Sequence, residues 1–136
     1  MKAINVYLTF DGNCLEAMTF YAKCLGAELQ SHSFAEMPGG APPGMENRTM
    51  HACVSKGPLA IMASDTMPGM PLTPGNNFSI SIAPDSKEET NQLFAALSEG
   101  GNAVMPLGDQ FWGAYFGMLK DRFGVQWMLN YEHPRS

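Results

Sequence analysis

The chain is poor in charge, and above all in positive charge. Only 15% of its 136 residues are charged, and eight Lys and Arg stand against thirteen Asp and Glu, which gives a formal net charge of −5. The basic residues are scattered and form no stripe that would neutralise phosphates, so neither nucleic acid nor an anionic membrane surface is an expected partner. The sequence also lacks a run of roughly 20 apolar residues, and its alternating start does not resemble a signal peptide.

Cysteine is scarce as well. The three cysteines are odd in number and lack the spacing of a metal site: Cys14, Cys24 and Cys53. We interpret them as reduced thiols, which favours a cytoplasmic location. What the chain does have is a hydrophobic content of 45%, enough for a packed core, and eleven methionines. Four of these lie in Pro/Gly-rich segments, where flexible thioethers suit an adaptable apolar rim over a site: Met37, Met45, Met67 and Met70.

Apolar periodicity predicts the same order of elements twice. The first half has a helix capped by Asn13 and Glu16 and ended by Gly26, between strands expected at 2–10, 27–34, 49–55 and 58–64. The second half has a helix capped by Ser86 and Glu89, between strands expected at 77–83, 102–107, 114–120 and 125–131. Such a repeat indicates a duplicated unit whose copies bury one another. We therefore expect one domain built from modules 1–66 and 76–136.

The patterns also assign faces to the elements. In the first strand Ile4, Val6, Leu8 and Phe10 are expected inside, opposite Asn5, Tyr7 and Thr9. The first helix is expected to bury Leu15, Met18, Ala22 and Leu25, and the second to bury Leu93, Phe94 and Leu97. The intervening segment 35–48 holds three prolines and three glycines and is a candidate lid.

The segment from Phe111 to Asn130 is the most specific part of the chain. It predicts two strands joined by a tight Asp121-Arg-Phe-Gly124 turn, with tryptophan and tyrosine next to glycines. Together with the paired modules and the helix end at Phe20–Gly26, it resembles the vicinal oxygen chelate superfamily of glyoxalases, bleomycin-resistance proteins and extradiol dioxygenases. More narrowly it resembles the PhnB-like branch, to which further segments are similar: Tyr7–Asn13, Ser33–Pro38, Met50–Ala52 and Met62–Asp65.

This resemblance implies an α+β fold in which two βαβββ modules form a cupped, eight-stranded mixed sheet, usually within a homodimer. Metal-dependent relatives carry a His or Glu on each of four strands facing the cleft. In this sequence those positions fall on Asn5, on Ala60 or Met62, on Ser79 and on Met128, which are poor ligands for a divalent metal. We therefore predict no metal and no cofactor. A divergent metal site that combines His51 with Glu36 or Glu46 is the alternative.

The other residues expected in the cleft are neutral. His51 shares a strand face with Cys53, opposite Met50, Ala52 and Val54, and is a candidate general base; the alternative is a structural histidine. Trp112, Tyr115 and Phe116 suit stacking on a planar ligand, or equally a core or dimer contact. The full set predicted to bind a ligand is Tyr7, Thr9, His51, Cys53, Met62, Ser79, Ser81, Trp112, Tyr115, Gln126, Met128 and Asn130.

Two functions follow from this set. The first is metal-free binding of a small apolar or planar molecule in a dimeric cleft. The second is a small-molecule enzyme that uses His51 as a base, with Tyr7 or Cys53 assisting it. Some PhnB-like proteins are described as ubiquinone methyltransferases, an activity not expected here, because the turn Asp11-Gly12-Asn13 before the first helix is an ordinary cap and not a Gly-rich cofactor loop.

Overall fold

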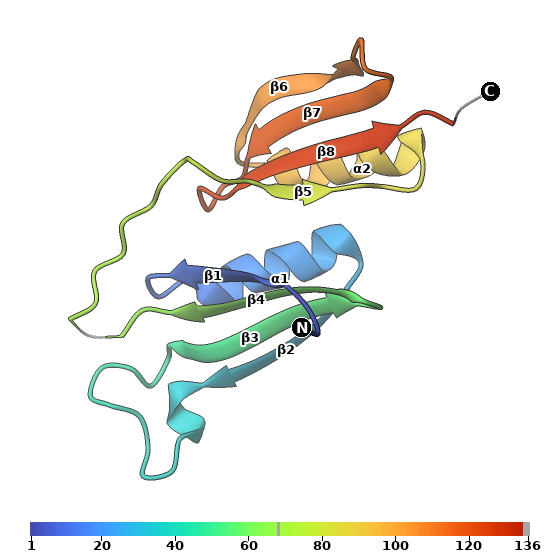
Figure 1. Cartoon of the computed structure of the whole chain (residues 1–136). Helices are drawn as coiled ribbons and strands as arrows, with labels where there is room; N and C mark the ends of the chain where they lie inside the picture. The colour runs from blue at the N-terminus through green and yellow to red at the C-terminus, as the bar shows by residue number, and fades with distance from the viewer. Residues whose placement is uncertain (68, 135–136) are drawn as a thin grey trace. The chain divides into compact units, whose positions relative to one another are not determined.

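The computed structural model describes residues 1–67 and 69–134 and divides the chain between Thr73 and Pro74 into two units (Figure 1). The division lies within the connection predicted between the two modules. Each unit contains one helix and one four-stranded mixed sheet, so the α+β fold with repeated βαβββ modules is confirmed. Neither of the α-helices in the described ranges is long and apolar enough to cross a membrane.

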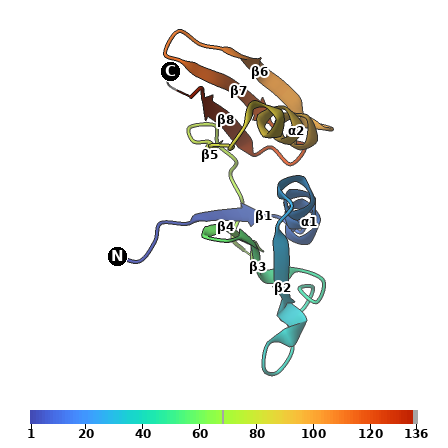
Figure 2. The ribbon, with the colours of Figure 1, turned by 90° about the vertical axis from the view of Figure 1, so that its right-hand side faces the viewer.

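The first unit packs α1 (Cys14–Leu25) on a sheet with the strand order β1-β4-β3-β2. Its strands are β1 (Val6–Phe10), β2 (Glu28–Ser33), β3 (Thr49–Lys56) and β4 (Leu59–Asp65), and the short 3-10 helix η1 (Phe34–Glu36) follows β2. β1 runs parallel to β4, whereas the other neighbours are antiparallel. The turned view in Figure 2 shows α1 on one side of this sheet, which leaves the other face without a helix of this unit.

The core of the first unit lies between α1 and its sheet. Leu8 and Phe10 are buried while Tyr7 and Thr9 are exposed, so the predicted alternation of β1 is confirmed from Val6 onward. Ile4 is a correction: it is 87% exposed, because the ladder between β1 and β4 begins at Val6 and gives Ile4 no partner strand.

Two expectations for α1 also need correction. The helix buries Cys14, Ala17, Met18 and Tyr21, whereas Leu15, which was predicted to be buried, is 48% exposed. The expected capping box does not form, because the Asn13 side chain accepts no capping hydrogen bond. A carboxylate from another strand occupies this helix end, as described below. Gly26 ends the helix as predicted, in the left-handed conformation (φ 61°) that glycine adopts without strain.

The second unit packs α2 (Lys87–Ser98) on a sheet with the strand order β5-β8-β7-β6. Its strands are β5 (Ile80–Ile82), β6 (Asn102–Asp109), β7 (Ala114–Lys120) and β8 (Gln126–Glu132). The Ser86 side chain accepts a hydrogen bond from the Glu89 N–H at 3.0 Å, which confirms the predicted cap of α2.

The core of this unit holds Leu97, Leu119, Trp127 and Leu129, so the burial expected for Leu97 is confirmed. β5 is shorter than the predicted strand 77–83, because its ladder with β8 covers only three residue pairs. Phe78 therefore lies outside the sheet and is 66% exposed.

Candidate functional site

The face of the first sheet opposite α1 carries five of the predicted ligand-binding residues. We call it the first open face and define it by Tyr7, Thr9, His51, Cys53 and Met62. Met62 on β4 lies opposite Tyr7 on β1 and opposite Cys53 on β3, so these three side chains form a row across three strands. The alternation of each strand brings together residues that are far apart in the sequence.

Tyr7 and His51 interact across this face. The Tyr7 hydroxyl lies 3.3 Å from Nδ1 of His51, and the two rings are 5.9 Å apart at an interplanar angle of 33°. Because β4 separates β1 from β3, the tyrosine side chain reaches over the intervening strand to make this contact. Tyr7 is 50% exposed, so the pair is accessible to a ligand in this unit. His51 is therefore held by a side chain as well as by its strand.

The neighbour of His51 on β2 is His32, which lies opposite it in the ladder. Nδ1 of His32 is 3.1 Å from Glu36 Oε1, and the second carboxylate oxygen accepts a 2.7 Å hydrogen bond from the Ser33 N–H. The hydrogen bond from His32, followed by that from Ser33, lowers the pKa of Glu36. Glu36 thus interacts with His32. The alternative metal site considered above would instead pair Glu36 with His51.

The positions compared above with the metal ligands of metal-dependent relatives lie partly on strands and partly outside them. Asn5 precedes β1 and Ser79 precedes β5, whereas Ala60 and Met62 lie on β4 and Met128 on β8. Within residues 1–67 and 69–134, no three His, Cys, Asp or Glu side chains are grouped closely enough to hold a metal ion.

The open face of the second sheet is rich in methionine. Met128 lies opposite Ser81 on β5 and opposite Met118 on β7, and Met118 lies opposite Met105 on β6. We call Met105, Met118 and Met128 the methionine row. Asn130 lies on the same face opposite Phe116. Gln126 is partly engaged already, since its side-chain amide donates a 2.8 Å hydrogen bond to the Phe78 carbonyl.

Aromatic side chains gather at one end of this second face. Trp112 lies in the turn between β6 and β7 and is 53% exposed. Its ring lies 5.1 Å from that of Phe111 and 5.8 Å from that of Phe116, edge to face in both cases. These edge-to-face contacts are a favoured arrangement for aromatic pairs and position the indole beside the open face.

Tyr115, which was grouped with Trp112 and Phe116, lies on the other side of the sheet. Its hydroxyl donates a 2.6 Å hydrogen bond to Asn91 Oδ1 on α2, and the Lys87 ammonium group lies 4.8 Å from the centre of its ring. Successive residues of a strand point to opposite faces, so Tyr115 and Phe116 cannot both line one surface. Tyr115 is therefore a contact between α2 and its sheet rather than part of the open face.

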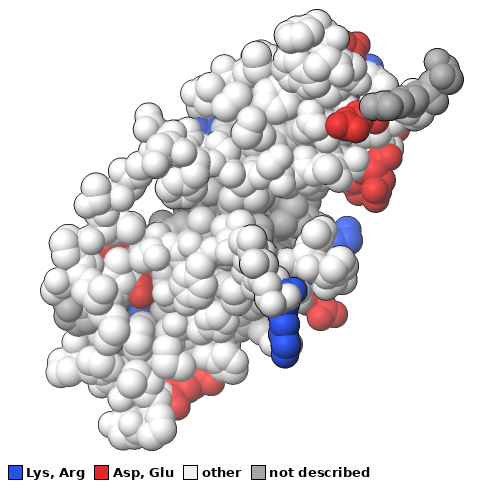
Figure 3. All heavy atoms as spheres, viewed as in Figure 1, with Lys and Arg blue, Asp and Glu red and all other residues white. Residues whose placement is uncertain are grey.

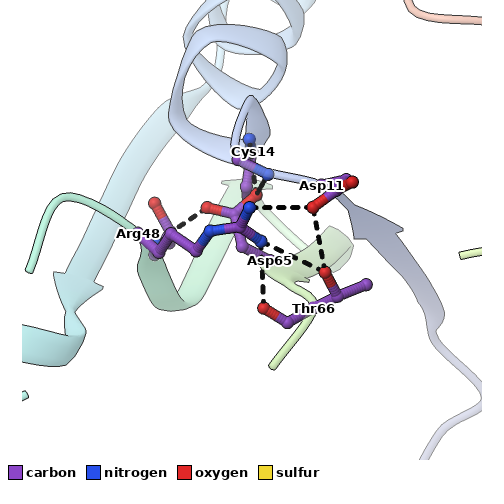
Figure 4. Close-up of polar contacts among 7 residues, drawn as sticks. Asp11, Cys14, Arg48, Asp65 and Thr66 are labelled. Atoms are coloured by element: carbon purple, nitrogen blue, oxygen red, sulfur yellow. Dashed lines mark hydrogen bonds and ion pairs between the residues drawn. The ribbon is translucent and has the colours of Figure 1, made fainter. Parts of the chain in front are cut away.

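Asp65 was not among the predicted site residues. This residue ends β4 and is 4% exposed. Its Oδ1 accepts hydrogen bonds from the N–H groups of Gly12 (2.8 Å) and Cys14 (3.0 Å), and its Oδ2 accepts one from Thr49 (2.8 Å). Asp65 thus joins the start of α1, the start of β3 and the end of β4 (Figure 4). The signal in the sequence was an aspartate directly after a buried strand.

A second polar group, anchored by Arg48, lies beside Asp65. Nη2 of Arg48 is 2.8 Å from Asp11 Oδ1, and Nη1 donates to the carbonyl and the hydroxyl oxygen of Thr66, both at 3.2 Å (Figure 4). The hydrogen bond from Arg48 is the main reason why the pKa of Asp11 is lowered. Arg48 ends the predicted lid segment, so this network fixes one end of that segment to β1 and β4.

Charge is sparse over much of the molecular surface. On the side drawn in Figure 3, blue and red side chains are scattered among large neutral areas and no basic patch is visible. The residues that define the two open faces are uncharged polar, aromatic or sulfur-containing. The surfaces available to a ligand therefore favour shape, stacking and dispersion over charge.

Comparisons with solved structures identify the class of fold. A glyoxalase/bleomycin resistance protein from Albidiferax ferrireducens T118 is 18% identical with a TM-score of 0.66. The superposition covers 98% of this chain and 100% of that chain. An enzyme of the glyoxalase/bleomycin resistance protein/dioxygenase family from Burkholderia phytofirmans has a TM-score of 0.68 at 15% identity. At these identities the likeness shows the glyoxalase/bleomycin-resistance fold alone.

Closer relatives show the family. The family described as 3-demethylubiquinone-9 3-methyltransferase matches residues 2–130, so the chain belongs to this PhnB-like family. Protein YjdN of Escherichia coli is 35% identical in an alignment of 138 positions that covers 93% of each chain. The crystal structure of protein PA1353 from Pseudomonas aeruginosa is 45% identical with a TM-score of 0.88, covering 96% of this chain and 98% of that one.

Proposed function

We propose that this PhnB-like protein binds a small, largely apolar or planar molecule, without a metal, on the open faces of its sheets in the cleft of a homodimer. The observation that carries the proposal is the methionine row beside Trp112 and Phe116 on the second sheet. Methionine fills irregular space at low cost, and aromatic rings offer flat surfaces for stacking. Such a lining binds through contact area and has little means of driving hydrolysis.

The first open face adds one directed polar contact. Tyr7 and His51 lie 3.3 Å apart on a surface that otherwise presents Met62 and Cys53. A ligand with a carbonyl or hydroxyl group would find a donor or acceptor here, as is typical of pockets in which a few polar groups fix the orientation of an apolar ligand. The cytoplasm and a homodimer are part of the same proposal, and light scattering that gives the mass of a monomer would contradict the dimer.

The family description names a methyltransferase, and we do not propose that activity. Sites of the dinucleotide type use free N–H groups at the start of a helix to bind the cofactor. In this chain the N–H groups of Gly12 and Cys14 at the start of α1 already donate to Asp65. The local geometry therefore supports a structural role for this turn.

Fluorescence offers a direct test, because the chain has two tryptophans with opposite surroundings. Trp112 is 53% exposed beside the second open face, and Trp127 is fully buried. Titration with menadione, an uncharged planar quinone, should quench part of the emission with a saturating curve, and Trp112→Phe should remove that part. Calorimetry on the same samples checks that the quenching reports binding.

Matched charge variants locate the site. Met105→Glu places a carboxylate on the methionine row, whereas Leu59→Glu places one on an exposed residue of the other unit, where the side chain is 67% exposed. We expect Met105→Glu to weaken binding by about tenfold or more and Leu59→Glu to leave it unchanged. Quenching that does not saturate, or that Met105→Glu leaves intact, would contradict the proposal.

The contact between Tyr7 and His51 also favours a second function, an enzyme with His51 as general base. In that case a ligand found by the titrations would be converted slowly to a product, and NMR of the incubated mixture would detect it. His51→Ala should abolish the conversion and Tyr7→Phe should reduce it, while circular dichroism confirms that both variants fold. Turnover that survives in His51→Ala would exclude this role.

A further inference from the structure

A pocket in the first unit shares no lining residue with either open face. Because β1 and β4 are parallel, they end at the same edge of the sheet, and the residues that follow them meet the end of the 35–48 segment there. These three pieces of chain line an open pocket of about 440 Å³. This volume is in the range of small-molecule sites, which run from about 300 to 1,000 Å³.

Three thioethers supply most of the apolar wall. Met45, Met67 and Met70 all line the pocket, together with two prolines and two glycines. Met45 is 2% exposed and is part of the packed structure, whereas Met67 and Met70 are 43% and 64% exposed. Three of the four methionines predicted to form an adaptable rim are thus brought together, while Met37 is not among the lining residues. Met67 and Met70 are thus large apolar side chains that remain exposed to solvent, and a ligand in the pocket would cover them.

The polar wall is formed by Asp11, Arg48 and Thr66. The guanidinium group is held by Asp11 at 2.8 Å and by two oxygens of Thr66 at 3.2 Å, and its side chain is 30% exposed. These contacts fix the position of the group before any ligand arrives. A guanidinium carries five N–H donors, more than the contacts with Asp11 and Thr66 use, so donors remain for a ligand.

The charge of the lining selects the ligand class. Asp11 and Arg48 are its two charged residues, and they form an ion pair, so the wall is neutral as a whole. An anionic ligand would be attracted by Arg48 but repelled by the adjacent carboxylate of Asp11, and a cationic ligand would meet the reverse, so neither gains net charge complementarity. An uncharged molecule avoids both penalties, since unpaired charges close together cost binding free energy.

We propose that this pocket binds a small uncharged apolar molecule with one carbonyl acceptor, such as a ketone or an ester. The acceptor faces the guanidinium of Arg48, and the hydrocarbon part lies against Met45, Met67 and Met70. The site shares no residue with the open faces, so it is independent of the function proposed above.

The eleven methionines make the test specific. In protein labelled with ¹³C at the methionine methyl groups, each signal is assigned by a single Met→Leu variant, and 2-octanone is titrated as the probe. We expect saturating shifts of the Met45, Met67 and Met70 signals. The signals of Met62, Met118 and Met128 report the open faces separately, so binding of the probe there is distinguished from binding in the pocket.

Two comparisons make the outcome decisive. Octanoate, the anionic counterpart, should bind about tenfold more weakly than 2-octanone because of Asp11. Met70→Glu should weaken the binding of 2-octanone by a similar factor, while Met50→Glu, at an exposed methionine of β3 outside the pocket, should not. Shifts confined to the open-face methionines, no saturation up to the solubility of the probe, or tighter binding of octanoate would each overturn the proposal.

Discussion

Replacement of Asp65 by asparagine tests the account of the first unit most directly. The two carboxylate oxygens accept three backbone N–H donors from Gly12, Cys14 and Thr49 in a site that is 4% exposed. An amide keeps one of these oxygens and replaces the other with an NH₂ group. In either orientation at least one buried backbone N–H then faces a second donor and loses its partner.

The expected cost follows from this loss. A buried polar group without a partner costs about 1–3 kcal/mol, and the remaining hydrogen bonds weaken because the acceptor is no longer charged. We therefore expect Asp65→Asn to lower the free energy of unfolding by about 2–4 kcal/mol. With a slope of about 2 kcal/mol per M in urea, the unfolding midpoint should fall by about 1–2 M.

The assay can separate the two units, because both tryptophans lie in the second one. Urea unfolding followed by far-ultraviolet circular dichroism reports both helices, whereas tryptophan fluorescence reports the second unit. Asp11→Asn is the control, since Asp11 is exposed and its ion pair with Arg48 should contribute little. A circular dichroism transition that Asp65→Asn shifts no more than Asp11→Asn would refute the assignment of Asp65 as the central acceptor.

Three other predictions concern pH, thiol reactivity and packing. The pKa of Asp11 is lowered from 3.8. The contribution of Asp11 to stability is therefore present above pH 3.8 and is lost as the pH falls through the lower pKa of the native state. The effect of Asp11→Asn on the urea midpoint should thus vanish in acid. Burial, and then the charge of Asp65, raises the pKa of the Cys14 thiol to about 12. In the native protein at about pH 8, a disulfide reagent should therefore modify Cys24 and Cys53 but not Cys14. Fast reaction of all three thiols would show this prediction to be wrong. A Cβ at Gly101 would lie 2.8 Å from Cα of Asp121, so Gly101→Ala should lower the free energy of unfolding by about 1–3 kcal/mol, as thermal unfolding would show. Gly108→Ala is the control and should be nearly neutral, because its Cβ would have no neighbour closer than 4.0 Å.

Much of the fold could be predicted because its signals are local. The alternation in β1 and β8, the Ser86 cap and the Gly26 stop each depend on residues within one element and its neighbours. Errors arose where a distant residue decides the outcome. Asn13 is at the first cap position, but the acceptor for this helix end comes from Asp65, 51 residues beyond Cys14, and no local pattern predicts this contact.

The candidate site shows the same division. Strand parity placed Tyr7 and His51 on one face, although the contact between them depends on the strand order β1-β4-β3, which the sequence does not state. Tyr115 was grouped with its aromatic neighbours by proximity in sequence, and alternation moves it to the face of α2. The pocket beside Arg48 depends on two loops that meet, so the sequence pointed to its methionines without showing the polar wall that accompanies them.

The methionine row also determines which surface of this protein is oxidised first. Oxidation turns a flexible thioether into a polar sulfoxide, and it proceeds fastest at accessible side chains. Met105 is 39% exposed, whereas Met18 in the first core is fully buried and protected. Peroxide would therefore alter the open face of the second sheet before it disturbs the packing beneath α1, and this face would become more polar while the circular dichroism spectrum stayed the same.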